Sequence, residues 1–366
     1  MANRLRVAVL FGGRSHEHEV SHLSARNVVA SLDPLKYEVV PVAVTRTGRW
    51  IAADLEENRL PSDIPVDGEE LCLLPGGGGR ALLVPHSGAP REIPAIDILF
   101  PVLHGLHGED GTIQGAASVA GVPLAGCDLA GSANAIDKDI AKRLLREAGL
   151  PVARSVTIRA GGKPSFEEIA EALGTPVFVK PARQGSSVGV GKASTAEEFD
   201  IALAEAFLCD RKVLVEEFVQ GREVEFGILQ KADGSVLVSL PGEIVPADTH
   251  RFYTYEAKYV DADGAILNAP ADLPGEVTER LQATALSAFR ALECDGMARV
   301  DFFVRPDMSF VVNEVNTIPG FTDISMYARA FAASGISYAE ILDCLIEFGL
   351  ARAGRAKVGP RPAKFR

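Results

Sequence analysis

The sequence is poor in cysteine, and long apolar runs are missing. Its five cysteines, among 366 residues, are scattered, odd in number and never spaced as Cys-x-x-Cys. This excludes a disulfide framework, speaks against a zinc site and fits a reducing compartment. The apolar run from Val7 to Phe11 is short and ends in glycines, which predicts a strand. No apolar run approaches the ~18 residues that are needed to span a membrane. We therefore expect a cytoplasmic protein with no membrane partner.

The sequence also has fewer basic than acidic residues. Lys and Arg total 37 against 49 Asp and Glu, which gives a net charge of −12. An acidic surface argues against nucleic acid as a partner, although a few local cations can still hold one anionic nucleotide. With 47% hydrophobic residues the chain has enough apolar side chains for a large core, and its length suits two or three domains.

The apolar pattern predicts alternating strands and helices in the N-terminal third. A strand at 7–11, a helix from 21 to 32 and a strand at 37–44 form a βαβ unit, which implies a parallel sheet. Residues 45–91 form an excursion with short strands, and buried strands resume at 96–103.

A second and a third portion follow. A helix at 138–148 marks the passage into the second portion, and the strand at 212–216 opens a third, mixed one. The basic tail from Ala351 is expected to be frayed. The other expected elements are the strand 177–180, the helix 194–206, the strands 223–229, 235–240, 296–304 and 309–315, and the helix 276–292.

A lysine at a strand end is followed by a turn rich in Gly and Ser, Gln184 to Gly191. Glycines let backbone N–H groups approach phosphate oxygens, hydroxyls add donors, and Lys180 adds a positive charge. An ordinary β-hairpin is the alternative. The segment is not a P-loop, because the order Gly-x-x-x-x-Gly-Lys-Ser/Thr is absent.

Carboxylates recur on two neighbouring strands. Strand alternation places Arg299 and Asp301 on one face of a strand, and Glu314 and Asn316 on one face of the next. If the two strands pair, hard oxygen ligands suited to Mg²⁺ converge. The alternative is a solvated face with cross-strand ion pairs, which the strongly apolar flanks disfavour because a buried carboxylate needs a cation or donor.

Three further segments allow two interpretations each. Glu216 and Glu223 flank apolar residues that suit an adenine edge and a ribose, or they are simply charged strand ends. His104 follows a strand at the end where ligands bind in open α/β sheets, or it belongs to a Gly-rich turn. The aromatic stretch 252–259 is a mobile lid carrying Lys258 and Tyr259, or an aromatic cluster.

The loop before the first helix, Phe11 to Ser21, holds two His and two Glu. Their spacing does not match His-Glu-x-x-His, so a metal site is disfavoured there. Recognition of a charged small molecule suits the loop better, because a helix N-terminus favours anions and Glu17 can hold an ammonium group.

Taken together, these segments resemble the D-alanine–D-alanine ligase family in their order along the chain. The matching pieces are Phe11 to Ser21, His104 to Gly115, Asp137-Lys138, Lys180 to Gly189, Glu216 to Glu223, Tyr255 to Tyr259, Arg299 to Asp301 and Glu314 to Met326. The resemblance implies an α/β, three-domain ATP-grasp architecture. The expected domains are a parallel-sheet (Rossmann-like) substrate domain at 1–134, a small central α+β domain at 135–212, and a mixed-sheet, metal-binding domain at 213–366.

The resemblance also implies roles for individual residues. Lys138, Lys180, Ser187 and Lys258 would contact the ATP phosphates, and Glu216, Phe218, Val219 and Glu223 the adenosine. Asp301, Glu314 and Asn316 would hold two Mg²⁺ (or Mn²⁺). Glu17 would hold the ammonium of the first D-alanine, His104 would contact a substrate, and Ser325 and Met326 would border the second substrate. Arg299 and the Gly320 N–H would stabilise the oxyanion, and Glu17, Ser186 and Tyr259 would link the domains through hydrogen bonds.

The implied activity is ATP-dependent ligation of two D-alanine molecules through an acyl phosphate, for peptidoglycan synthesis, by a homodimer. The chemistry agrees, because phosphoryl transfer needs positioning and charge neutralisation rather than a nucleophilic side chain. Alternatives remain. Asp323, where the family has an uncharged residue, leaves acceptor preference open, and D-serine or D-lactate are candidates, although Tyr259 argues against D-lactate. A nucleotide-binding regulatory protein and a nicotinamide dehydrogenase are rivals, but Gly12-Gly13 lacks the Gly-x-Gly-x-x-Gly spacing.

Overall fold

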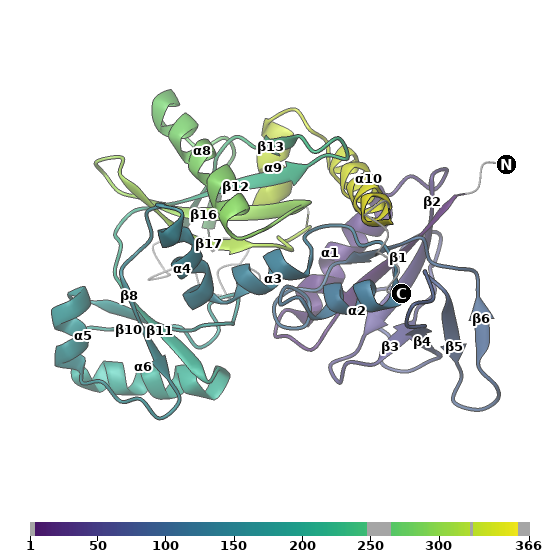
Figure 1. Ribbon diagram of the computed structural model, residues 1–366, viewed down its shortest axis with the longest axis horizontal. Coiled ribbons are helices and arrows are strands. Elements are labelled where there is room, and N and C mark those ends of the chain that lie inside the picture. Colours follow the sequence, from purple (N-terminus) through teal and green to yellow (C-terminus); the bar gives the residue numbers. More distant parts are fainter. Residues whose placement is uncertain (1–3, 247–264, 323–324, 358–366) are drawn as a thin grey trace, which may run out of the picture.

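The computed structural model describes residues 4–246, 265–322 and 325–357, and every structural statement below refers to these ranges. Their strands form three β-sheets, with helices packed between and around them (Figure 1). The α/β class expected from the sequence is confirmed. Within these ranges no helix combines the length and the apolar character that crossing a membrane requires.

The first sheet has the strand order β6-β5-β4-β3-β2-β1-β7. Its parallel part, β1 (Leu5–Gly12), β2 (Tyr37–Val44) and β7 (Ile98–Pro101), follows the βαβ pattern, and the second half of β1 is buried throughout. The excursion adds antiparallel strands to one edge, so the sheet is mixed rather than purely parallel. They are β3 (Trp50–Ala52), β4 (Glu70–Leu73), β5 (Ala81–Val84) and β6 (Arg91–Ile93).

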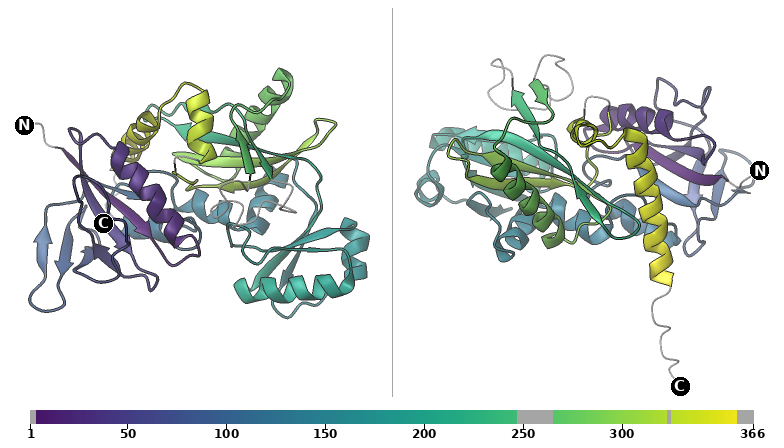
Figure 2. Two further views of the ribbon diagram at one scale, coloured as in Figure 1. Left: turned by 180° about the vertical axis from the view of Figure 1, so that it is seen from behind. Right: turned by 90° about the horizontal axis from the view of Figure 1, so that it is seen from above.

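Helices cover both faces of this sheet. Alternate β1 side chains pack against α1 (His18–Ser31) on one face, and those between them against α2 (Thr112–Ala120) on the other. The face of α1 is shared by α10 (Tyr338–Lys357), which therefore returns to the first sheet (Figure 2). The expected fraying is wrong for residues 351–357, because α10 continues to Lys357 and Arg352 is held by Asp295 and by the carbonyl oxygens of Leu124 and Gly126. The rest of that tail, 358–366, lies outside the described residues.

The second sheet is antiparallel, in the order β10-β9-β11-β8, with α5 (Phe166–Leu173) and α6 (Ala196–Cys209) against it. Its strands are β8 (Ser155–Arg159), β9 (Val177–Pro181), β10 (Gly191–Ala193) and β11 (Lys212–Glu217). The expectation that the strand at 212–216 opens the third portion is wrong, because β11 pairs with both β8 and β9.

The third sheet has the order β15-β14-β12-β16-β17, with β13 paired to β12. Its strands are β12 (Arg222–Gln230), β13 (Val236–Val238), β14 (Gly242–Pro246), β15 (Ala265–Asn268), β16 (Met297–Val304) and β17 (Phe310–Asn316). One face packs on α3 (Leu129–Ile136), α4 (Lys138–Glu147) and α8 (Gly275–Ala291), and the other on α9 (Met326–Ala333). The helix expected to lead into the second portion, α4, therefore shares its core with the third sheet.

Candidate active site

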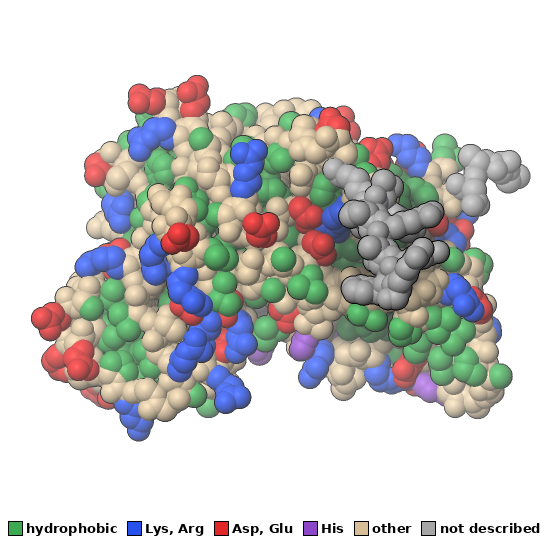
Figure 3. All heavy atoms as spheres, viewed as in Figure 1, with side chains coloured by type: hydrophobic (Ala, Val, Ile, Leu, Met, Phe, Trp, Pro, Cys, Tyr) green, Lys and Arg blue, Asp and Glu red, His purple; other side chains and the backbone are tan. Residues whose placement is uncertain are grey.

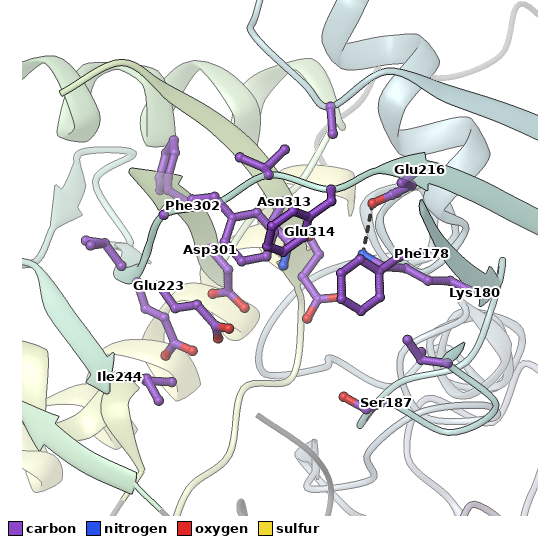
Figure 4. A pocket seen from close by; sticks show the side chains of 18 of the residues that line it. Phe178, Lys180, Ser187, Glu216, Glu223, Ile244, Asp301, Phe302, Asn313 and Glu314 are labelled. Atoms are coloured by element: carbon purple, nitrogen blue, oxygen red, sulfur yellow. Dashed lines mark hydrogen bonds and ion pairs between the residues drawn. The ribbon is translucent and has the colours of Figure 1, made fainter. Parts of the chain in front are cut away.

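A cavity of about 470 Å³ lies between the second and third sheets. Its walls come from β9 and β11 of the second sheet, from the loop 184–190, and from β12, β14, β16 and β17 of the third. Figure 4 shows the carboxyl groups of Glu223, Asp301 and Glu314 on one side and Ser187 on the facing loop. The volume lies within the ~300–1,000 Å³ typical of sites for nucleotides and other small ligands.

The loop that faces the acidic side chains is the connection of a hairpin, since β9 and β10 pair in antiparallel fashion. The hairpin interpretation is therefore confirmed, and it does not exclude the phosphate interpretation. Ser186 and Ser187 have φ of 49° and 59°, the left-handed region that side chains other than glycine rarely adopt. Such strain is kept mainly at functional sites. Lys138, from the first turn of α4, donates to the carbonyl oxygen of Gln184 at 2.7 Å and so reaches this loop.

A buried carboxylate between two lysines forms one wall. Glu216 Oε2 accepts from Lys180 Nζ at 2.8 Å (Figure 4). Lys142 Nζ lies 3.2 Å from Glu216 Oε1. Burial alone would raise the pKa of Glu216, but the charges of Lys142 and Lys180 lower it to about 2. Glu216 is therefore ionised at any physiological pH, and Lys180 reaches the cavity as a cation.

Two aromatic rings lie next to this wall, with Lys180 Nζ 5.9 Å from the Phe178 ring centroid. The rings of Phe178 and Phe218 lie 6.0 Å apart, and Lys192 Nζ sits 4.8 Å from the Phe218 ring centroid. Val219 also lines the cavity, and Ile244 lies beside Glu223 on the side of Asp301 (Figure 4). Phe218 keeps 41% of its surface exposed, so its ring offers an apolar face to a planar ligand.

The acidic end is built by β16 and β17, which pair as expected. Asp301 stands opposite Glu314 and Arg299 opposite Asn316, with a bulge after Asp301. Asn316 Nδ2 donates to Asp301 Oδ2 at 2.9 Å, and Glu314 Oε2 lies 3.6 Å from Lys138 Nζ. Among the described residues no three His, Cys, Asp or Glu side chains gather as a metal site. A metal here would therefore need the Asn316 amide oxygen or oxygens of a bound ligand in addition to the two carboxylates.

Arg299 belongs to this acidic end. Its Nε and Nη2 donate to the two oxygens of Asp301, each at 2.7 Å, and Nε lies 3.0 Å from Glu225 Oε2. Burial opposes the charge, but Asp301 and Glu225 raise the pKa of Arg299 beyond its usual range. The guanidinium is thus a fixed cation between two carboxylates.

The N-terminal loop meets the serine loop beside the cavity. Ser186 Oγ donates to Glu17 Oε1 at 2.5 Å, which joins the first sheet to the second through one hydrogen bond. In Figure 3 the surface is hollowed between these two parts of the molecule, and Lys and Arg side chains gather on the side of the second sheet. An anionic ligand that enters this hollow would therefore meet positive charge.

Another set of contacts between distant parts of the chain holds the segment that follows β17. His104 Nδ1 lies 3.0 Å from the Ile318 carbonyl oxygen, and Glu109 accepts from the backbone N–H groups of Gly105 and Ile318 at 2.8 and 2.9 Å. Burial, with the nearby charge of Glu17, raises the pKa of Glu109 to about 7. We name this set of contacts the Ile318 junction. It fixes the backbone just before Gly320.

Gly320, Ser325 and Met326 lie beyond this junction. Ser325 Oγ accepts from the Thr322 backbone N–H at 3.0 Å and lies where a Cβ on Gly320 would come within 2.8 Å of it. Met326 is buried at the start of α9, against Gly242. Lys258, Tyr259 and Asp323 lie outside the described residues.

The site thus combines two aromatic rings with two lysines and a serine loop. Paired carboxylates lie on the other side, beside a fixed arginine. Comparison with known proteins identifies the family. Models described as the D-ala D-ala ligase N-terminus and C-terminus match residues 6–127 and 144–347. The D-alanine–D-alanine ligase A of Brucella melitensis is 57% identical, over 96% of this chain and 99% of its own. The chain belongs to the D-alanine–D-alanine ligase family.

Solved structures of the ligase family agree. The D-alanine–D-alanine ligase of Coxiella burnetii has a TM-score of 0.85 at 34% identity and covers 97% of both chains. The VanG D-Ala:D-Ser ligase of Enterococcus faecalis has a TM-score of 0.81 at 34% identity, over 95% of this chain and 100% of its own. The three-domain ATP-grasp architecture expected from the sequence is confirmed.

The cavity of this ligase brings together ten of the residues singled out from the sequence: Lys138, Lys180, Ser186, Ser187, Glu216, Phe218, Val219, Glu223, Asp301 and Glu314. Glu17, His104, Arg299, Asn316, Gly320, Ser325 and Met326 do not line it and lie around it as described above.

Sequence reasoning missed several residues of the site. Phe178 precedes Lys180 by two positions and so shares its face of β9. Lys142 follows Lys138 by four positions and so shares its face of α4. Glu225 follows Glu223 on the same face of β12. In each case the spacing was a usable signal. Glu109 had none, because its partner Ile318 is 209 residues away.

Proposed function

We propose that this ligase works in the cavity between its second and third sheets, with the residue roles given below. As a member of the D-alanine–D-alanine ligase family it is an ADP-forming enzyme that joins two D-alanine molecules into D-alanyl-D-alanine for peptidoglycan synthesis. The observation that carries the proposed location is that one cavity combines the Phe178–Phe218 rings with lysines on one side and carboxylates on the other.

This combination suits the base, the ribose and the phosphates of ATP. We place the adenine against Phe218 and Val219, with Glu216 and Glu223 accepting hydrogen bonds from the adenine and ribose. The phosphates then meet Lys138, Lys180 and the serine loop, where cations and hydroxyls are available. We assign Lys258 to the same phosphates from a lid.

We propose two Mg²⁺ (or Mn²⁺) ions at the acidic end, held by Asp301, Glu314 and Asn316. The fit rests on chemistry: two carboxylates face each other across paired strands, and an amide stands next to one of them. Bound there, the ions would supply neutralisation of phosphate charge. The hydrogen bonds of Asp301 to Arg299 and Asn316 would orient its carboxylate toward the cavity.

The two amino acids are assigned to the hollow beside the serine loop. Glu17, oriented by Ser186 and with Tyr259 as third member, holds the ammonium of the first D-alanine, and His104 borders it. Its carboxylate attacks the γ-phosphorus of ATP, ADP leaves, and an acyl phosphate forms. The amine of the second D-alanine, bordered by Ser325 and Met326, attacks the acyl carbon and phosphate departs.

The oxyanion of this second step needs donors that are fixed beforehand. Arg299 is held by Asp301 and Glu225, and the segment before Gly320 is held by the Ile318 junction. Both are rigid in the way that such stabilisation requires. We therefore assign the oxyanion to Arg299 and to the backbone N–H of Gly320.

Phosphate release from ATP tests the assignment of substrates. With Mg²⁺ and D-alanine we expect rapid release and D-alanyl-D-alanine as product, and no release with L-alanine. Addition of D-serine or D-lactate to D-alanine resolves the acceptor, and a mixed product as the main one would move the assignment to that acceptor. No D-alanine-dependent release despite tight ATP binding would refute the substrate assignment.

Three further assignments come from the resemblance and the sheet arrangement. We propose a homodimer located in the cytoplasm, which light scattering and cell fractionation would check. We also propose domains close to 1–134, 135–212 and 213–366. The second boundary is better placed after Glu217, because β11 belongs to the second sheet.

A further inference from the structure

Lys142 lies one helical turn after Lys138 on α4, behind the cavity wall. Its side chain is 2% exposed, and its Nζ lies 3.2 Å from Glu216 Oε1. The contact is an ion pair that lacks hydrogen-bond geometry. Lys138, Lys180 and Glu216 line the cavity, whereas Lys142 does not. Lys142 therefore reaches a nucleotide only through Glu216.

Burying this ammonium group is costly. A buried charge loses its hydration, and a single ion pair without good hydrogen-bond geometry does not fully offset that loss. Burial accordingly lowers the pKa of Lys142, against the opposing effect of Glu216. An apolar side chain of the same length would fill the space without that cost. The position therefore calls for the charge of the lysine rather than its volume.

The charge matters because Glu216 also binds Lys180. The same carboxylate accepts from Lys180 Nζ at 2.8 Å on its other oxygen. Two ammonium groups around one carboxylate leave one net positive charge at the wall of the cavity. If Lys142 were neutral, Lys180 and Glu216 would cancel, and Lys180 would be held by an anion that no other lysine shares.

We propose that Lys142 is a charge-balancing residue that lets Lys180 present a net positive charge to the phosphates of the nucleotide. This inference rests on the proposed binding of ATP in the cavity and adds a residue that does not touch the ligand. Lys142 offsets Glu216, so that Glu216 can hold Lys180 in place without neutralising its field. It is a positioning residue, not a catalytic one.

The test compares the binding of ATP and AMP by calorimetry, in the wild type and in variants. Both ligands share the adenosine contacts, so the ratio of their dissociation constants reports the added phosphates alone. Lys142→Met should reduce the preference for ATP by about tenfold, the scale of one charge a few ångströms away in a partly buried site. Lys142→Arg should retain most of the preference. The exposed Lys163→Met serves as matched control and should leave it unchanged.

A double variant separates charge from packing. Lys142→Met with Glu216→Gln again leaves one net positive charge, so the preference for ATP over AMP should return toward the wild-type value, although both ligands bind more weakly. Packing damage would lower both affinities and would not be reversed by Glu216→Gln. If Lys142→Met alone does not fold, comparing the double variant with Glu216→Gln still removes the same charge and should lower the preference.

Failure of the inference differs from failure of the proposed function. Equal affinity of the wild type for ATP and AMP would refute the proposal that this wall of the cavity binds the phosphates of ATP. A strong wild-type preference that persists in Lys142→Met would overturn the role of Lys142 alone. A double variant as impaired in its preference as Lys142→Met would also overturn it.

Discussion

The cavity and the Ile318 junction use buried charge in different ways. In the cavity and directly beside it, charged side chains bond to one another, as Lys180 does to Glu216 and Arg299 to Asp301. At the junction, Glu109 bonds to backbone N–H groups of two distant segments. A pair of side chains fixes the position of a charge, whereas a bond to the backbone fixes the chain itself. The cavity is therefore built to accept charge, and the junction to hold shape.

The largest effect that would sharpen this comparison is expected at Arg299. Arg299→Ala removes the oxyanion cation and leaves Asp301 and Glu225 facing each other without it. Dipeptide synthesis should fall by roughly 10²–10³-fold or more, and unfolding should become easier by about 3–5 kcal/mol. Coupled phosphate release and chemical unfolding measure the two losses.

ATP binding by Arg299→Ala should stay close to that of the wild type at a temperature where the variant is folded. The exposed Arg290→Ala is the control and should change neither rate nor stability. Near-normal turnover by Arg299→Ala would remove the arginine from the chemistry.

A smaller effect is expected at Glu314, on the acidic side of the cavity. Glu314→Gln keeps the shape of the side chain but loses the charge that faces Asp301. The Mg²⁺ concentration for half-maximal activity should rise by about tenfold, because one unit of ligand charge is lost. A Mg²⁺ titration of activity measures this, with the exposed Glu276→Gln as control. Superimposable titrations would place the metal elsewhere.

A third effect, on stability rather than activity, is a pH dependence at the Ile318 junction. Burial raises the pKa of Glu109 to about 7, so its protonated form is favoured in the folded state. That contribution to stability is complete below pH 4.5 and is lost as the pH rises toward 7. Between pH 5 and 8 the wild type should lose on the order of 2 kcal/mol of unfolding free energy relative to Glu109→Gln.

Chemical unfolding of both proteins at several pH values measures this difference. Glu171→Gln, at an exposed position of α5, is expected to track the wild type throughout. Parallel stability curves for the wild type and Glu109→Gln would show that Glu109 does not titrate in this range.

The elements predicted from the sequence were those with long, regular patterns. The β1–α1–β2 unit, the helix α8 and the pair β16–β17 came from periodicity, because local spacing alone determines which face is buried. Strand alternation also placed Asp301 with Glu314 correctly. The part of the site that depends on local spacing could therefore be predicted from the sequence.

Elements that depend on distant partners were missed. The helix α3 is short and rich in small residues, and its Gly131 packs so close to the Cys294 backbone that an added Cβ would lie 2.6 Å from it. The sequence of β11 is compatible with either the second or the third sheet. Only its pairing with β8 and β9 shows that it belongs to the second. No local pattern carries this information, just as none reveals the tie between Glu109 and Ile318.

The return of α10 to the first sheet has a consequence for biosynthesis. Val7, Val9 and Phe11 share their core with Ile341 and Leu345, which the ribosome adds more than three hundred residues later. While most of the chain is made, α1 can cover only its own part of this face, and the part that α10 covers stays open, although the other face can already pack on α2. The nascent protein would expose that apolar part during translation, which is the kind of surface that chaperones protect, until the last helix emerges.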